Sequence, residues 1–133
     1  MTDNELLSGF ESCTLANEAF HHPEHVRVAF LYLSGYSVLE ALQRFSTALV
    51  RFAAAHGKTT LYNETVTWAY ILLIHERLAR SGRKQTWTDF QSANADLFDR
   101  KQDILKKYYR PETLQSELAK RTFVFPDRCE TPG

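Results

Sequence analysis

The chain is organised around residues 20–33, which read FHHPEHVRVAFLYL and combine three of its five histidines with the start of an apolar helix. Pro23 is favoured as the first helical residue, because the N–H that proline lacks would have no helical partner there. His22 then occupies the cap, and Glu24 suits the positive end of the helix dipole. We therefore predict a helix that begins at Pro23 and ends at about Leu33.

A second polar stretch, YNETVT at residues 62–67, stands at the start of the most apolar helix of the chain. This helix is expected to start between Thr60 and Asn63 and to end at Gly82. Its middle is apolar on nearly every side, which is typical of the most buried helix in a bundle. We expect the rest of the chain to bring these two helix openings together.

The helix between the two openings has the clearest amphipathic pattern. Ser37 is its predicted cap, and Glu40, three residues later, completes a capping box. Gly57 is a favourable residue just beyond its C-terminus. Its apolar side chains recur at intervals of three and four residues: Val38, Leu39, Leu42, Phe45, Leu49, Phe52 and Ala53. This spacing predicts a helix with one buried face.

The two ends of the chain carry weaker patterns. Residues 1–19 predict a short helix or a loosely ordered arm. Beyond Gly82 we expect a short helix near residues 86–90, a helix over 97–109, a break at Pro111, a short helix over 114–121 and a tail over 122–133. No alternation of polar and apolar residues predicts a sheet. The predicted fold class is all-α: a compact bundle of four to five helices with a short packed C-terminal tail, in one domain over residues 1–133.

The composition restricts the classes of function. The chain has 133 residues, of which 44% are hydrophobic, and its 16 basic side chains balance its 16 acidic ones. Nucleic-acid binders and membrane-surface proteins need a sustained positive face, which this chain lacks. Cys13 and Cys129 lie far apart with no metal-binding spacing, which suits a reducing compartment, and the N-terminal residues do not resemble a signal peptide. We therefore expect a cytoplasmic protein that binds neither nucleic acid nor membranes.

His25 and Glu64 form the centre of the expected site. Helical spacing places His25 beside the apolar stripe of its helix, and Glu64 at the head of an inward-facing stripe. A carboxylate there is costly unless it is paired or hydrogen-bonded. We therefore expect Glu64 to be largely buried and to contact His25 directly or through water, and we take these two as the candidate catalytic residues. The candidate ligand-binding residues are His22, Tyr32, Tyr62, Asn63 and Thr67.

Three hypotheses account for this polar cluster. His22, His25 and Glu64 match the two-histidine, one-carboxylate set that binds catalytic divalent metals, so a divalent metal is a candidate cofactor. The absence of an HExxH motif and the cap position of His22 count against it. In a metal-free pocket, His25 or Glu64 would act as the acid or base. In the third hypothesis, the pair only satisfies polar groups in the core.

Three segments resemble a family of small bacterial all-helical proteins. They are residues 20–33 (FxHxxHVRxAxxYL), 62–67 (YNETVT) and 123–127 (FVFPD). In that family the second segment reads YHETxT and the third FxxPD. This chain departs from the pattern at Asn63, where the family usually has histidine, so a histidine ligand or base would be missing there. The family has no assigned activity, so the resemblance supports the site without implying a function.

Two classes of function fit these observations. The first is a helical domain that handles a small molecule in a histidine, glutamate and tyrosine pocket at the two helix openings, and an enzyme is one form of it. The alternative is a non-catalytic helical interaction module. There the His–Glu cluster is structural, and an apolar face around Trp87, Phe90 and the tail is exposed. We favour the first class, because this polar cluster exceeds what packing alone requires. Neither class predicts the oligomeric state.

Overall fold

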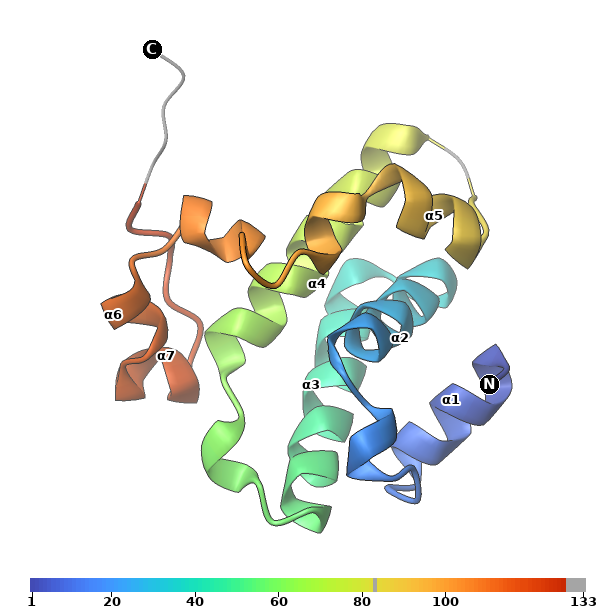
Figure 1. Ribbon diagram of the computed structural model, residues 1–133, viewed down its shortest axis with the longest axis horizontal. Helices are drawn as coiled ribbons and strands as arrows, with labels where there is room; N and C mark the ends of the chain where they lie inside the picture. Colours follow the sequence, from blue (N-terminus) through green and yellow to red (C-terminus); the bar gives the residue numbers. More distant parts are fainter. Residues whose placement is uncertain (83, 129–133) are drawn as a thin grey trace.

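The computed structural model describes residues 1–82 and 84–128. Within these ranges the chain forms an all-α bundle without a β-strand, which confirms the predicted fold class (Figure 1). The helices are α1 (Asp3–Glu11), α2 (His22–Gly35), α3 (Val38–Ala55), α4 (Glu64–Ser81), α5 (Trp87–Ala93), α6 (Pro111–Leu114) and α7 (Glu117–Arg121). Short 3-10 helices span Asn17–Ala19, Thr59–Leu61, Ala95–Phe98 and Ile104–Lys107. None of the described helices is both long and apolar enough to cross a bilayer.

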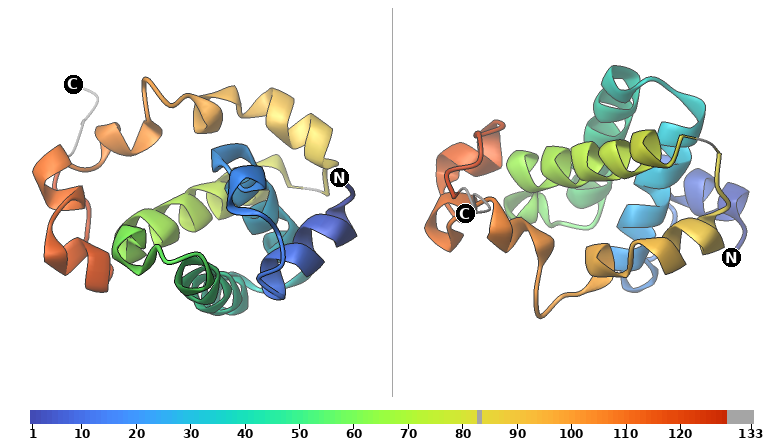
Figure 2. Two further views of the ribbon diagram at one scale, coloured as in Figure 1. Left: turned by 60° about the horizontal axis from the view of Figure 1, so that its bottom comes forward. Right: turned by 90° about the horizontal axis from the view of Figure 1, so that it is seen from above.

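Helices α2, α3 and α4 pack against one another at the centre of the bundle (Figure 2). The start of α2 lies one residue before the predicted position, because His21 is the cap and Pro23 is the second helical residue. The Glu24 carboxylate accepts a hydrogen bond from the backbone N–H of His21 at 2.8 Å. The predicted cap of α3 is confirmed, since the Ser37 hydroxyl accepts from the N–H of Glu40 at 3.3 Å.

The predicted bounds of α4 are confirmed as well. Asn63 is its cap, and its side-chain oxygen accepts from the N–H of Val66 at 3.0 Å. The amide nitrogen of the same side chain donates to the carbonyl of Leu114 at 2.7 Å, which ties the start of α4 to α6. Gly82 ends the helix with a φ of 71°, a left-handed conformation that glycine adopts at little cost.

The first 19 residues are not a loosely ordered arm. Thr2 caps α1, and Leu6 and Phe10 on its inner face are fully buried. The Phe10 ring stacks on Phe20, with 4.8 Å between centroids, and so joins α1 to the segment that enters α2. Gly9 and residues 12–14 weaken the helical pattern in the sequence, yet the burial of Leu6 and Phe10 makes α1 part of the core.

The predicted helix over residues 97–109 is wrong. Two 3-10 helices, Ala95–Phe98 and Ile104–Lys107, replace it, with a turn between them. The Asp99 carboxylate accepts from the N–H groups of Lys101 and Gln102, each at 3.0 Å. Asp103 accepts from the N–H of Leu105 at 2.9 Å. Both aspartates thus satisfy backbone donors locally and end the helix that the apolar spacing predicted.

The C-terminal segment also differs in detail from the prediction. The helix expected over residues 114–121 begins later, as α7, because Ser116 caps it through the N–H of Ala119. A separate short helix, α6, begins at Pro111, where the sequence predicted a break. The following tail packs on the bundle as expected. Phe123 stacks on Trp68 with 5.5 Å between centroids, and the N–H of Val124 donates to the hydroxyl of Thr65 at 3.1 Å. The remainder of the predicted tail, 129–133, lies outside the described residues and includes Cys129.

Candidate functional site

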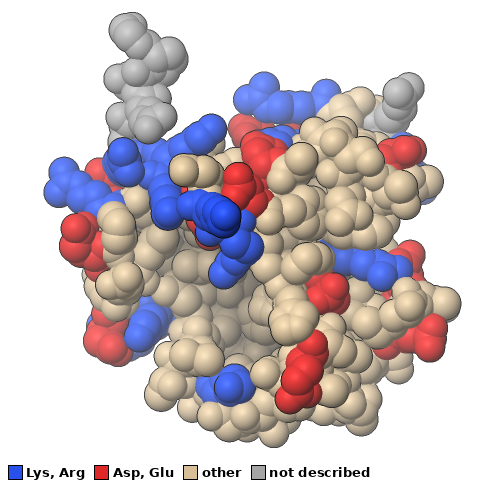
Figure 3. All heavy atoms as spheres, viewed as in Figure 1, with Lys and Arg blue, Asp and Glu red and all other residues tan. Residues whose placement is uncertain are grey.

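A cavity lies where the openings of α2 and α4 approach α3. It consists of two adjoining hollows of about 340 and 370 Å³. Six side chains line both hollows: Phe20, His25, Leu49, Leu61, Val66 and Thr67. Figure 3 shows a hollow at the centre of this face, with mostly uncharged walls and Lys or Arg side chains above and below it. The two helix openings therefore meet as predicted, and they meet across a cavity.

His25 occupies the wall between the two hollows. Its ring stacks on Phe20 with 4.1 Å between centroids and hydrogen-bonds to the backbone of Phe20, and no side chain within residues 1–82 or 84–128 hydrogen-bonds it. Burial, with smaller contributions from the neighbouring His22, Arg100 and His21, lowers the pKa of His25 to about 4. The ring is therefore neutral at pH 7, with one donor and one acceptor nitrogen.

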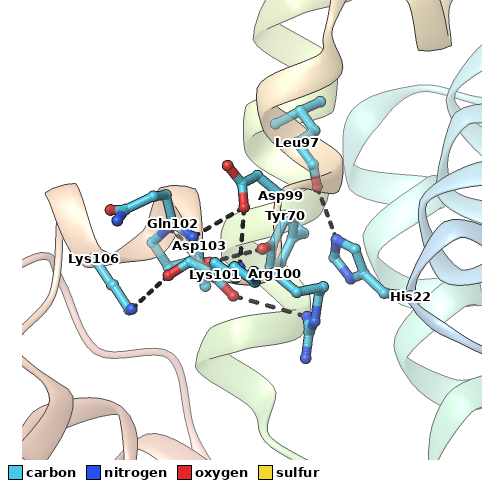
Figure 4. Close-up of polar contacts among 10 residues, drawn as sticks. His22, Tyr70, Leu97, Asp99, Arg100, Lys101, Gln102, Asp103 and Lys106 are labelled. Carbon is cyan, nitrogen blue, oxygen red and sulfur yellow. Dashed lines mark hydrogen bonds and ion pairs between the residues drawn. The ribbon is translucent and has the colours of Figure 1, made fainter.

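His22 lines the first hollow and is anchored to the 3-10 helix Ala95–Phe98. Its Nε2 lies 2.8 Å from the carbonyl oxygen of Leu97, and since a carbonyl only accepts, Nε2 carries the proton. The His22 ring meets Tyr70 edge-on at 5.0 Å, and the Tyr70 hydroxyl donates to Asp103 at 2.8 Å (Figure 4). Burial, as the main cause, lowers the pKa of His22.

The opening of α4 supplies the polar groups of the second hollow, which Tyr62, Asn63 and Thr67 line. The Thr67 hydroxyl donates to the backbone carbonyl of Asn63 at 2.8 Å, so its methyl group is left for contact with a ligand. Burial raises the pKa of Tyr62, and its hydrogen bond to Glu64 raises it further. Tyr62 is therefore a neutral hydrogen-bonding group at pH 7.

Two predicted site residues do not join the cavity. Glu64 is half-buried and accepts a hydrogen bond from the Tyr62 hydroxyl. No hydrogen bond or ion pair between Glu64 and His25 exists in the described part of the chain, so the expected direct contact is wrong, and a contact through water stays a prediction. Tyr32 lies seven residues beyond His25, about 10 Å along the helix axis. Its hydroxyl instead donates to Glu11 at 2.5 Å, beside a different surface hollow.

The proposed metal ligands are not assembled. Among the residues that the structure describes, no three His, Cys, Asp or Glu side chains are grouped closely enough to hold a metal ion. The reason is that two of the three proposed ligands are hydrogen-bonded to other groups. Nε2 of His22 is bound to the Leu97 carbonyl, and Glu64 is bound to Tyr62. His22, His25 and Glu64 therefore do not form the two-histidine, one-carboxylate set.

The cavity also contains charged residues that the sequence did not single out. Arg100 lines the first hollow and Lys58 the second. Arg100 lies in the turn between two 3-10 helices, where the sequence predicted continuous helix, so no pattern placed it near α2. Lys58 follows Gly57 at the end of α3, and its neighbour Leu61, 69% exposed, forms part of the cavity rim.

Comparisons of the chain with protein-family models, with curated proteins and with solved structures find no match. The resemblance to small bacterial helical proteins stays a prediction based on residues 20–33, 62–67 and 123–127. Two of these segments do border the cavity, and the third packs beside Thr65 on the following turn of α4. The geometry of the cavity is therefore the basis for any functional argument.

Proposed function

We propose that the protein binds a small molecule in the cavity between α2, α3 and α4. Each hollow falls at the lower end of the volume range of ligand pockets, about 300–1,000 Å³. The walls combine apolar side chains such as Leu49 and Val66 with a few polar groups, which is the usual composition of such pockets. His22, His25 and Asn63 are the polar groups best placed to orient a ligand.

The observation that carries this proposal is the environment of His25. A buried imidazole normally has both nitrogens hydrogen-bonded, and leaving one without a partner costs about 1–3 kcal/mol. His25 lines both hollows, and one of its nitrogens bonds to the backbone of Phe20, while the other has no side-chain partner in the described ranges. If the polar cluster were only structural, side chains would fill this volume and hydrogen-bond the His25 ring. An incoming ligand would supply the missing contact.

The same geometry limits the chemistry that we propose. His25 is a candidate proton donor or acceptor for a bound ligand, because its ring borders both hollows. Glu64 bonds to Tyr62 and does not line either hollow, so we do not pair it with His25 as a catalytic base. Ligand binding is therefore the proposed function, and turnover would depend on His25.

The test is a fragment screen read by NMR signals of the His25 ring. Fragments that bind in the cavity are expected to shift the His25 signals. Thr67 lines both hollows, so Thr67→Phe places a ring in the cavity and should abolish these shifts. Thr47→Phe, on the exposed face of α3, is the matched control and should leave them unchanged. Shifts that survive Thr67→Phe would place the ligand elsewhere, and a screen without His25 shifts would contradict the proposal.

The alternative function, a helical interaction module, retains one supporting observation. Phe125 in the tail is 81% exposed, beside an apolar hollow of about 270 Å³ that Leu72, Tyr108 and Phe123 help to line. By contrast, Phe90 is fully buried, so the other part of the expected apolar face is core. Sedimentation of the wild type and Phe125→Ser at several concentrations tests this alternative, because self-association through the tail would be lost in the variant.

We also propose a cytoplasmic location, for which the support is the cysteine usage. Within residues 1–82 and 84–128, Cys13 has no disulfide partner. A free thiol persists most readily in a reducing compartment. Fractionation of cells that produce the tagged full-length protein would test the proposal, and recovery outside the cytoplasm would contradict it.

A further inference from the structure

The titratable side chains that line the cavity are all bases or tyrosines. Histidines 21, 22 and 25, together with Arg100, line the first hollow, and Lys58 lines the second. No aspartate or glutamate within the described ranges lines either hollow. The whole chain has equal numbers of acidic and basic residues, so this excess of bases is a local property of the cavity.

The charge of Arg100 is only weakly compensated. Its Nη1 lies 3.8 Å from Asp103, and its side chain is 64% exposed. The same aspartate accepts from the Tyr70 hydroxyl at 2.8 Å and from the N–H of Leu105 at 2.9 Å, so it is shared among three donors. Figure 4 shows His22 and Arg100 on neighbouring elements, and both line the first hollow. The positive charge of Arg100 reaches His25, whose pKa it helps to lower.

Apart from these charged residues, the lining of the cavity is suited to contact with an apolar part of a ligand. Phe20, Leu49 and Val66 line both hollows and supply apolar wall to each of them. A volume of 340 Å³ accommodates roughly ten non-hydrogen atoms, at about 30 Å³ for each water-sized group. The cavity thus has a basic mouth and an apolar interior of limited size.

We infer that the ligand is a small amphipathic anion, with one carboxylate or phosphate at Arg100 and an apolar chain or ring between Leu49 and Val66. This inference depends on the proposed function, because it assigns the ligand class of the same cavity. A carboxylate or phosphate accepts charge-assisted hydrogen bonds from a guanidinium. The N–H of His22 is donated to Leu97 and that of His25 to the backbone of Phe20, so Arg100 is the donor for the head group.

The test compares probes of equal chain length by calorimetry on the full chain. Octanoate and octyl phosphate carry the proposed head groups, octanol is the neutral match, and octylamine has the opposite charge. Octanoate is expected to bind about tenfold more tightly than octanol, in line with one added charge-assisted contact. Octylamine should bind more weakly than octanol. The order of octanoate and octyl phosphate distinguishes a carboxylate ligand from a phosphate ligand.

Variants locate the head group. Arg100→Gln should weaken octanoate binding about tenfold and leave octanol binding unchanged. Arg80→Gln, which removes an arginine that is 74% exposed on α4 and pairs with Glu76, is the matched control and should bind both probes as the wild type does. A loss confined to Lys58→Gln would overturn the placement at Arg100. Thermal melts of each variant establish that it is folded.

The failure of this inference differs from the failure of the proposed function. Octanol binding equal to octanoate binding, and insensitive to Arg100→Gln, would overturn the anionic ligand class while the cavity remained a binding site. If none of the four probes binds, the inference is wrong whatever the fragment screen shows. If the screen also leaves the His25 signals unchanged, the proposed function fails with it.

Discussion

Replacing His25 with phenylalanine should make the protein less sensitive to acid. The histidine has an ordinary pKa of 6.5 in the unfolded chain and a pKa of about 4 in the folded protein, where burial is the main cause. As the pH falls below 6.5, the unfolded chain takes up the proton first, so protonation favours unfolding. The stability that depends on neutral His25 is complete above pH 6.5 and is lost as the pH falls to about 4.

The magnitude follows from the difference between the two pKa values. A difference of about 2.5 pH units, at 1.36 kcal/mol for each unit, corresponds to at most about 3 kcal/mol of unfolding free energy. Phenylalanine is a suitable replacement because the native ring already stacks on Phe20 at 4.1 Å and the adjoining hollow of about 340 Å³ can take the larger ring. The variant should therefore fold at neutral pH.

The assay is urea unfolding followed by far-ultraviolet circular dichroism at a series of pH values from 7 down to about 4. The wild type should lose up to about 3 kcal/mol more than His25→Phe over this interval. His75→Gln is the control, because His75 is exposed on α4, and it should follow the wild type. If His25→Phe and the wild type lose stability in parallel, His25 is not held neutral by the fold and the reasoning is wrong.

Three further predictions concern stability and use the same unfolding assay. Phe123→Ala should lower the unfolding free energy by about 1–2 kcal/mol, because its ring stacks on the bundle, whereas Phe125→Ala at an 81% exposed position should change it by less than about 0.5 kcal/mol. The losses of unfolding free energy caused by Glu64→Ala and His25→Ala should add within about 0.5 kcal/mol in the double variant. A coupling above about 1 kcal/mol would show a contact that the structure lacks. Asn63→Ala should lower the unfolding free energy by about 1–2 kcal/mol, because the cap of α4 is lost, whereas Asn63→Asp should keep most of this stability. Equal losses in the two variants would contradict the capping role.

The parts of the fold that could be predicted from the sequence depend on neighbours along the chain. The cap of α3 at Ser37 and the cap of α4 at Asn63 are bonds over three residues, so their donors and acceptors are visible in the sequence. Residues 95–107 are also governed by local bonds. There the apolar spacing favoured a helix while Asp99 and Asp103 favoured turns, and the spacing alone could not decide between them.

The helical spacing of the sequence predicts only part of the candidate site. Helical spacing correctly indicated that His22 and His25 point to one side of α2, yet it does not specify distance along the helix or the choice of side-chain partner. Tyr32 shares that side of α2 and still lies about two turns away, where it bonds to Glu11. Arg100 reaches the cavity because the 3-10 helix Ala95–Phe98, which precedes its turn, packs against α2. Contacts between such distant segments cannot be read from spacing along the chain.

The basic character of the cavity has a cause in how the neighbouring acids are used. Each of the two helix openings contains one glutamate. Glu24 accepts from the N–H of His21 at the start of α2, and Glu64 accepts from the Tyr62 hydroxyl at the start of α4. Because both carboxylates are engaged beside their own helix, His22 and His25 face the cavity without an acidic partner. The two openings therefore approach each other without an ion pair between them, and an anionic ligand would provide the negative charge that this arrangement leaves out.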